Sequence, residues 1–246
     1  MKILLAPSET KTAGGENPPF TKDSYIFPEL FAKREEVLTK YNEHINSCDD
    51  EQLCKLFGLK DINKAKEFKI DIFNAPTKKA IDRYTGVAYD YLDYPSLSDS
   101  QKTYINQNTI IFSNIFGPIL ADQDVPNYKL KQGEKIDGFA IEKFYKQNFS
   151  ETLDKYLEDE DILDIRAGFY DKFYVPKKKY TTLKFLKGGK VVSHWAKAYR
   201  GMVLREVAKN NINSVDELMK LNIKNLNIEE IKIIKNKQEL VYSISE

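Results

Sequence analysis

The residues of this chain best suited to chemistry are a run of cations in its last third. Between Lys172 and Lys209 the sequence holds eleven Lys or Arg residues and a single carboxylate, Glu206. The 22 residues before it, Ser150 to Asp171, hold eight acids against two bases, although the whole chain carries a formal charge of only +1. Charge segregated in this way creates a local positive field that attracts polyanions, phosphates above all. The alternative is that these cations only cover the solvated faces of a hairpin and a helix.

The cationic run contains a dense cluster from Ser193 to Gly201, four residues before Arg205. Its cations Lys197 and Arg200 stand beside two aromatic residues, Trp195 and Tyr199. Aromatic rings interleaved with cations suit stacking on a base together with contacts to its phosphates. Most of the other tyrosines and phenylalanines are expected in the core.

The loop that follows the first expected strand is a second candidate anion site. It runs from Ala6 to Gly15 and contains Ser8, Lys11 and two glycines. Such a loop can offer backbone N–H groups, hydroxyls and an ammonium to an anion. It is not a Walker A loop, because its spacing to the lysine differs from that motif. An ordinary surface loop is the competing interpretation.

A tight glycine turn between two expected helices is the most specific of these signals. The segment from Leu53 to Phe68 places Gly58 between an apolar run and a second apolar face. It resembles a helix-hairpin-helix, a unit that contacts DNA phosphates without reading bases. Lysines at 55, 60, 64 and 66 would supply charge, although the second glycine of many such hairpins is missing. The alternative is a helical hairpin that only packs against the rest of the protein.

Two further small-residue turns stand beside apolar segments. They are Tyr84-Thr85-Gly86 and Ser113 to Pro118. Each could be ordinary turn chemistry. Together with Asp122, Tyr128 and Lys129 they could equally line a polar cleft, and the sequence leaves both interpretations open.

Composition and the remaining motifs favour a non-metal protein of a reducing compartment. His44 and Cys48 share a helix face, but two ligands do not form a zinc site. No hydrolase triad has a local signature, and nothing in the sequence indicates a cofactor. Two cysteines make no disulfide framework, which favours the cytoplasm. No run approaches the roughly 18 apolar residues of a membrane span, so we expect no membrane partner.

The expected elements mix helices and strands without a regular βαβ period. Helices are predicted over Pro28–Ser47, across the Leu53–Phe68 hairpin, and over Ala75–Tyr84, Asp99–Asn106, Ile141–Glu158, Ala196–Lys209 and Val215–Leu221. Strands are predicted over Lys2–Ala6, Thr109–Phe112, Asp161–Arg166, Tyr180–Leu186, Lys190–His194 and on both sides of Asn236-Lys237. This pattern favours an α+β fold with a mixed, partly antiparallel sheet over a doubly wound fold. We expect one domain over residues 1–246, with the hairpin as an insert at about 51–69.

Five of these segments occur in an order that resembles the YaaA peroxide-stress protein family over nearly the whole chain. The matching stretches are Leu5–Lys11, Tyr84–Gly86, Phe112–Gly117, Tyr128–Leu130 with Gly133, and Ala196-Lys197 with Arg200-Gly201 and Arg205. The chain departs from the family at Ala198, where a second lysine is frequent, and at His194-Trp195, where a different aromatic segment is usual. Both departures bear on the detailed geometry of a cationic cleft.

The resemblance implies an α+β fold with an electropositive cleft, a hairpin at Leu53–Phe68, DNA binding and a role in limiting iron-driven damage by hydrogen peroxide. The cleft cations it implies include Lys11, Lys197, Arg200 and Arg205. From motifs and resemblance together, the expected DNA- or anion-binding residues are Ser8, Lys11, Lys55, Gly58, Lys60, Lys64, Tyr84, Gly86, Ser113, Lys129, Lys197, Arg200 and Arg205.

Two functions remain open at this point. The first is a protein without a catalytic centre that binds double-stranded DNA by shape or damage and not by sequence. The second is an enzyme acting on a nucleotide or another small phosphorylated molecule, with Ser8, Lys11, Tyr84, Ser113, Lys197 and Arg200 around one pocket. A narrow, deep pocket would favour the enzyme, and a long open groove would favour DNA. A structural or adaptor protein is a third possibility, with no positive signal.

Overall fold

The strand β1 (Lys2–Leu5) lies inside a mixed sheet, and its apolar residues Ile3 and Leu4 are fully buried. In the computed structural model, which describes residues 1–192 and 195–245, β1 pairs in parallel with β3 (Thr109–Ser113) and with β6 (Ile162–Asp164). Every residue of β3 and β6 is buried as well. Short apolar runs of this kind are typical of strands covered on both faces.

The sheet continues on both sides of this centre. On one side β3 pairs antiparallel with β4 (Gly117–Leu120). On the other side β6 pairs in parallel with β7 (Tyr180–Lys187), which pairs in parallel with β10 (Lys237–Ile244) and antiparallel with the short β8 (Lys190–Val191). The antiparallel strand β9 (Leu226–Ile234) ends the sheet beside β10. A separate antiparallel pair joins β2 (Thr77–Lys79) to β5 (Asp124–Pro126).

The parallel strands reverse their order between β1 and β6. Across the sheet they run β3-β1-β6-β7-β10, whereas along the chain β1 comes first. After β1 the chain therefore adds β3 on one side of it, and later adds β6, β7 and β10 on the other side. Where the order reverses, the connecting loops diverge at the carboxyl ends of the strands and leave a crevice that commonly binds ligands.

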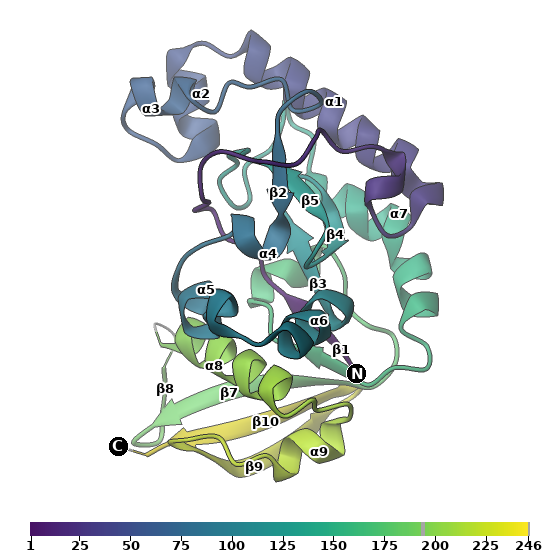
Figure 1. Ribbon diagram of the computed structural model, residues 1–246, viewed down its shortest axis with the longest axis vertical. Helices are drawn as coiled ribbons and strands as arrows, with labels where there is room; N and C mark the ends of the chain where they lie inside the picture. The colour runs from purple at the N-terminus through teal and green to yellow at the C-terminus, as the bar shows by residue number, and fades with distance from the viewer. Residues whose placement is uncertain (193–194, 246) are drawn as a thin grey trace.

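Helices cover the sheet and extend the molecule beyond it. They are α1 (Phe31–Ser47), α2 (Asp50–Phe57), α3 (Ile62–Lys66), α4 (Ala80–Arg83), α5 (Val87–Leu92), α6 (Asp99–Asn108), α7 (Ile141–Tyr156), α8 (Ala196–Lys209) and α9 (Val215–Lys220). Figure 1 shows α1, α2 and α3 at one end of the long axis, and α8 and α9 against β7, β10 and β9 at the other end. Within the described residues, no helix is both long and apolar enough to cross a membrane.

The structure confirms the α+β class and the mixed sheet, and it corrects several expected elements. The helix expected over Ala75–Tyr84 is wrong in its first half, because Thr77–Lys79 form β2 by pairing with the distant β5. The loop expected over Ser113 to Pro118 is only a tight turn, since Gly117 begins β4. The helix expected at Ala196–Lys209 is confirmed at both ends. The strand expected over Lys190–His194 is shorter, since β8 ends at Val191 and Val192 is not part of it; residues 193–194 lie outside the described residues.

Candidate anion pocket at the strand reversal

A pocket of about 500 Å³ lies at the carboxyl ends of β1 and β6, where the strand order reverses. Four parts of the chain line it together with Gln132: the end of β1 and its loop (Leu5–Thr10), the start of α5 (Thr85–Tyr89), three residues after β6 (Ile165, Ala167 and Tyr170), and two cations of α8 (Lys197 and Arg200). Of the expected site residues, the structure therefore brings Ser8, Gly86, Lys197 and Arg200 to one cavity.

The loop after β1 is fixed by two lysines that lie behind it. The Lys11 ammonium donates to the Ser8 carbonyl at 3.2 Å, and the Lys129 ammonium donates to the Glu9 carbonyl at 3.1 Å. The Glu9 carboxylate in turn accepts the backbone amide of Gln132 at 2.8 Å. In a trans peptide the N–H points opposite to the carbonyl, so the Glu9 amide is directed away from the Lys11 ammonium that binds the Ser8 carbonyl. The two lysines thus orient backbone donors and do not line the cavity themselves.

Gly86 allows this loop to approach the start of α5. Its φ of +101° is in the region that favours glycine, and an added Cβ would lie 3.2 Å from the Thr10 hydroxyl and 3.4 Å from the Ser8 hydroxyl. These two hydroxyls are themselves 3.0 Å apart, and that of Thr10 donates to the Thr85 carbonyl at 3.1 Å. A side chain at residue 86 would therefore crowd two hydroxyls that face the cavity.

A chain of buried hydroxyls supports the two lysines from below. The hydroxyl of Tyr128 lies 2.9 Å from that of Tyr84 and 2.8 Å from that of Ser113. The Lys11 ammonium stands 4.0 Å from the ring centre of Tyr128 and 5.2 Å from that of Tyr84. Cation–π contacts of this kind stabilise a cation that has lost its water. The expected residues Tyr84 and Ser113 therefore act in this buried network, one layer away from the pocket.

Burial changes the electrostatics of Lys11. Desolvation, and after it the nearby charge of Lys129, lowers the pKa of Lys11 to about 7, although Glu9 opposes the shift. Desolvation disfavours the charged form of an amine, and a like charge acts in the same direction. The Lys11 ammonium is thus close to losing its proton at neutral pH, so the positive charge behind the loop depends on pH.

The wall after β6 is held by a buried ion pair. The Arg166 guanidinium binds the Asp164 carboxylate through two contacts, at 2.9 Å and 2.6 Å, and donates to the carbonyls of Tyr170 and Tyr174. The Tyr170 hydroxyl donates to the Asn114 side chain at 3.1 Å. These bonds fix the segment from Ile165 to Tyr170, so this wall of the pocket is rigid.

Arg200 differs from the other arginines of the described chain, because each of those donates to a protein acceptor. Arg200 is half-buried, and it forms neither a hydrogen bond nor an ion pair with another described residue. Desolvation lowers the pKa of Arg200, and Asp164, which partly counters that shift, is already bound by Arg166. Lys197 is exposed and equally unpaired within the described residues. A desolvated, unpaired guanidinium at a cavity is well suited to an anion that brings the missing acceptors.

Close packing of α8 on α5 places these cations at the cavity. At Gly201 an added Cβ would lie 2.1 Å from the Ala88 carbonyl oxygen, so the two helices touch through backbone. Arg205, one turn further along, donates to the carbonyls of Leu92 and Asp93 and to the Ser96 hydroxyl. Arg205 therefore joins α8 to the end of α5, outside the pocket.

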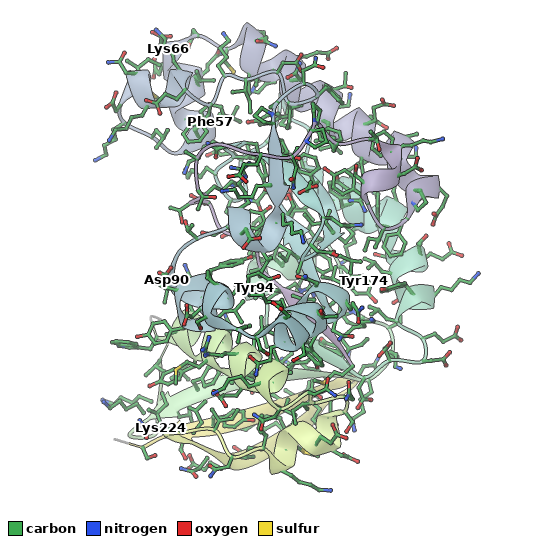
Figure 2. All side chains as sticks on the ribbon, in the orientation of Figure 1. Phe57, Lys66, Asp90, Tyr94, Tyr174 and Lys224 are labelled. Carbon is green, nitrogen blue, oxygen red and sulfur yellow. The ribbon has the colours of Figure 1, made fainter. Side chains whose placement is uncertain are left out.

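The remaining expected residues lie on the hairpin of α2 and α3. Lys55, Lys60 and Lys64 are exposed there, and Gly58 has a φ of +65° at the end of α2. Figure 2 labels Phe57, which is buried, and Lys66 at the outer edge, which pairs with Asp50 at 3.0 Å. The hairpin is a two-helix unit, and its assignment as a DNA-binding motif stays a prediction.

Sequence reasoning missed several residues of the pocket. Tyr89 and Tyr170 line it, yet they were among the tyrosines expected in the core from their residue type alone. Thr10 and Glu9 were within the loop singled out but were not chosen, and Gln132 had no local signal. The one usable signal was position, since Tyr89 follows the Tyr84–Gly86 turn by three residues. Residue types alone do not show which side of a buried ring faces a cavity.

Comparisons with known proteins place the chain in a family. A family profile described as peroxide stress protein YaaA matches residues 1–232. An uncharacterised protein of Campylobacter jejuni is 51% identical over 244 residues, covering 99% of both chains. A UPF0246 protein of Streptomyces coelicolor is 31% identical over 217 residues, covering 84% of this chain and 82% of the relative. A UPF0246 protein of Corynebacterium efficiens is 32% identical over 216 residues, covering 85% of each. The resemblance noted in the sequence is thereby confirmed, and this chain belongs to the YaaA peroxide-stress protein family.

Proposed function

We propose that this protein is a cytoplasmic peroxide-stress protein that binds double-stranded DNA by its phosphates and helps limit iron-dependent oxidative damage. The observation that carries the proposal is a set of cations without carboxylate partners in two parts of the molecule. Lys197 and Arg200 begin α8, and Lys55, Lys60 and Lys64 lie on the α2–α3 hairpin; none forms an ion pair within the described residues. Unpaired cations can replace the counterions of a polyanion, which is the main source of non-specific DNA affinity.

The elements that carry the two groups of cations lie along the same side of the ribbon in Figure 1. In Figure 1 the hairpin is at the upper left and α5 and α8 at the lower left, with the purple loop after β1 between them. If a duplex lay along this side, its phosphates would contact both groups of cations. Such contacts position DNA without reading bases, so binding directed by shape or damage fits this arrangement better than sequence recognition.

The hairpin would contact a DNA phosphate through its side chains more than through its backbone amides. The amides of Gly58 and Leu59 are bonded to the carbonyls of Lys55 and Cys54 at the end of α2. The Asp61 carboxylate accepts the amides of Asn63 and Lys64 and adds negative charge at the start of α3. A phosphate at this hairpin is therefore held mainly by the ammonium groups of Lys60 and Lys64.

Phosphate neutralisation also gives a physical route to the protective role. Ferrous ions associate with DNA as part of its counterion atmosphere, and a protein that neutralises phosphates releases such ions. Iron displaced from the duplex no longer generates hydroxyl radicals next to the bases. The protection then scales with the length of DNA that is covered.

The second candidate, an enzyme acting on a nucleotide or another small phosphorylated molecule, is favoured by the cavity itself. A volume of about 500 Å³ is within the range of small-ligand sites. Non-specific DNA binding alone does not require an enclosed cavity with a desolvated arginine. The same pocket would then hold the phosphate of the substrate at Lys197 and Arg200.

Binding of a fluorescently labelled duplex, followed by anisotropy over a salt series, tests the first proposal. We expect the logarithm of the association constant to fall linearly with that of the salt concentration, with a slope for about four to six neutralised phosphates. Lys197→Ala and Arg200→Ala should each weaken binding, while Lys220→Ala, at an exposed position on α9, should not. A response to salt that is flat, or a double variant of Lys197 and Arg200 that binds as well as the unchanged protein, would rule the proposal out.

A further inference from the structure

We propose that the pocket receives a single nucleotide extruded from the bound duplex. This inference rests on the proposed DNA binding and concerns what the cavity adds to it. A duplex cannot enter a cavity of about 500 Å³, whereas one nucleotide can. Proteins that examine or modify a base reach it by rotating the nucleotide out of the stack into a fitted pocket. The cavity and the unpaired cations beside it have the sizes and charges that such an event needs.

The walls of the pocket match a nucleobase in character. Tyr89 and Tyr170 contribute aromatic surface, and Ile165 and Ala167 contribute aliphatic surface. Both tyrosine hydroxyls already donate to protein acceptors, that of Tyr89 to the Ala6 carbonyl at 2.9 Å and that of Tyr170 to the Asn114 side chain. The rings are therefore held in place without an unsatisfied hydroxyl, and only a small part of each reaches the cavity, since Tyr89 is 8% exposed and Tyr170 is 3% exposed. Together with Ile165 and Ala167 they give the cavity an apolar lining, and apolar contact of this kind does not depend on which base is bound.

The polar groups of the pocket lie on the loop that the two buried lysines orient. Ser8, Glu9 and Thr10 line the cavity from the same segment, and Lys11 and Lys129 hold the carbonyls of Ser8 and Glu9. Hydroxyls both donate and accept, so they can meet the edge of any base. An extruded nucleotide of either purine or pyrimidine type finds partners there, which fits binding that does not depend on sequence.

The two cations at the pocket are placed to bind the phosphates of an extruded nucleotide. Lys197 is exposed, and Arg200, one turn later on α8, is half-buried and lines the same cavity. A nucleotide that leaves the stack brings its own phosphates to the mouth of the pocket, where these two cations lie. The phosphate oxygens would supply the acceptors that the Arg200 guanidinium lacks among the described residues.

An exposed aromatic residue stands beside the cations to fill the gap left in the duplex. Trp195 precedes the first residue of α8 and remains 56% exposed, although an indole of this size is usually buried. Extrusion costs a few kcal/mol of lost stacking and pairing. Apolar side chains inserted between base pairs compensate part of such a cost in other DNA-bending proteins. Trp195 would thus insert between the base pairs, and the pocket would hold the extruded nucleotide.

A duplex carrying one 2-aminopurine tests the inference, because this base fluoresces more strongly when it is unstacked. With the unchanged protein at saturation, established by anisotropy on the same duplex, we expect a several-fold rise in fluorescence. Ala167→Phe fills the cavity and should abolish the rise while leaving the affinity within a factor of a few. Ala32→Phe, the same change at an exposed site on α1, should leave both unchanged. Trp195→Ala should reduce the rise, and it removes no buried contact that the fold requires.

The outcomes separate this inference from the function on which it rests. Saturable binding with no rise in fluorescence overturns extrusion and leaves DNA binding intact. Absence of binding at low salt overturns both. Binding of free deoxynucleoside monophosphates is measured as well. If Ala167→Phe abolishes that binding while the duplex gives no rise in fluorescence, the pocket binds free nucleotides and the inference is wrong. If Ala167→Phe does not fold, as judged by circular dichroism, a fluorescence rise that Trp195→Ala leaves unchanged counts against the inference.

Discussion

The pocket and the α2–α3 hairpin both carry positive charge, but the two regions hold it in opposite ways. At the pocket, Lys11 is enclosed between two tyrosine rings and Arg200 is partly desolvated on α8. On the hairpin, Lys55, Lys60 and Lys64 are exposed on two short helices. The cations at the pocket have lost part of their hydration, whereas those on the hairpin remain hydrated.

This difference separates two uses of charge. Exposed lysines attract a polyanion from a distance, and salt screens them within about 8–10 Å at physiological ionic strength. A desolvated, unpaired cation instead destabilises the free protein until an anion arrives, so it adds selectivity for a ligand that fits. We therefore expect the hairpin to contribute only to how strongly DNA binds, and the pocket cations to contribute both to that affinity and to the choice of what is bound.

The largest predicted effect comes from the glycines that support each region. Gly201→Ala would place a Cβ 2.1 Å from the Ala88 carbonyl oxygen, where both partners are backbone and neither can rotate away. We expect the free energy of unfolding to fall by about 3 kcal/mol, the upper part of the range for overpacking. Gly58→Ala on the hairpin meets only the flexible Lys131 side chain, at 3.0 Å, and its left-handed backbone costs about 1–2 kcal/mol.

Urea denaturation of both variants beside the unchanged protein measures this contrast. A loss at Gly201 no greater than that at Gly58 would mean that α5 and α8 can move apart, and that the pocket is less rigid than the packing indicates. Circular dichroism before denaturation confirms that each variant is folded.

The elements of this fold that depend on local signals could be predicted, and those that depend on distant pairing could not. Ala196–Lys209 was predicted as a helix from its own pattern, and the structure has the same limits. Val215–Leu221 was also predicted as a helix, and α9 starts at Val215, where the Ser214 hydroxyl accepts the Glu217 amide at 3.2 Å. By contrast β2 exists because Thr77–Lys79 pair with β5, nearly fifty residues later in the chain. A helical composition at Ala75–Tyr84 was overridden by that partner.

The candidate site shows the same division. Four of its residues, Ser8, Gly86, Lys197 and Arg200, were chosen from loop and charge patterns and meet in one cavity. The part played by Lys11 was not foreseeable, because nothing in a lysine's neighbours along the chain shows that its ammonium will lie over the ring of Tyr128. Burial of a charged group is decided by tertiary packing, and the sequence carries no direct sign of it.

The second prediction concerns the pH dependence of stability. The pKa of Lys11 is lowered to about 7 in the folded protein, whereas an unfolded lysine titrates near 10.4. Between these values the unfolded chain binds the additional proton, so this group makes the free energy of unfolding rise with pH, by at most about 1.4 kcal/mol per pH unit. Lys11→Met keeps an unbranched chain of similar length on the tyrosine rings and removes the titration.

The difference in stability between the unchanged protein and Lys11→Met, measured by urea denaturation from pH 7.5 to 9.5, isolates this contribution. Tyrosines and Cys48, whose pKa values are raised by burial, titrate in both proteins and cancel. Lys60→Met, at an exposed hairpin position, is the control and should show a constant difference. A constant difference for Lys11→Met as well would show that its ammonium stays charged and hydrated.

The smallest predicted effect is the loss of DNA affinity in variants of the hairpin, which we compare with a variant of the pocket. Lys60→Ala and Lys64→Ala each remove one solvated ammonium, so each should lower the affinity by roughly threefold and the salt slope by about 0.9. Neither change touches the cavity, and the 2-aminopurine signal at saturation should therefore stay as it is in the unchanged protein. Arg200→Ala should likewise change the salt slope by no more than one contact, but unlike the hairpin variants it should greatly reduce the fluorescence rise. If the hairpin variants instead abolished the fluorescence rise at saturating protein, the two regions would act as one site, and the division between attraction and selection would be wrong.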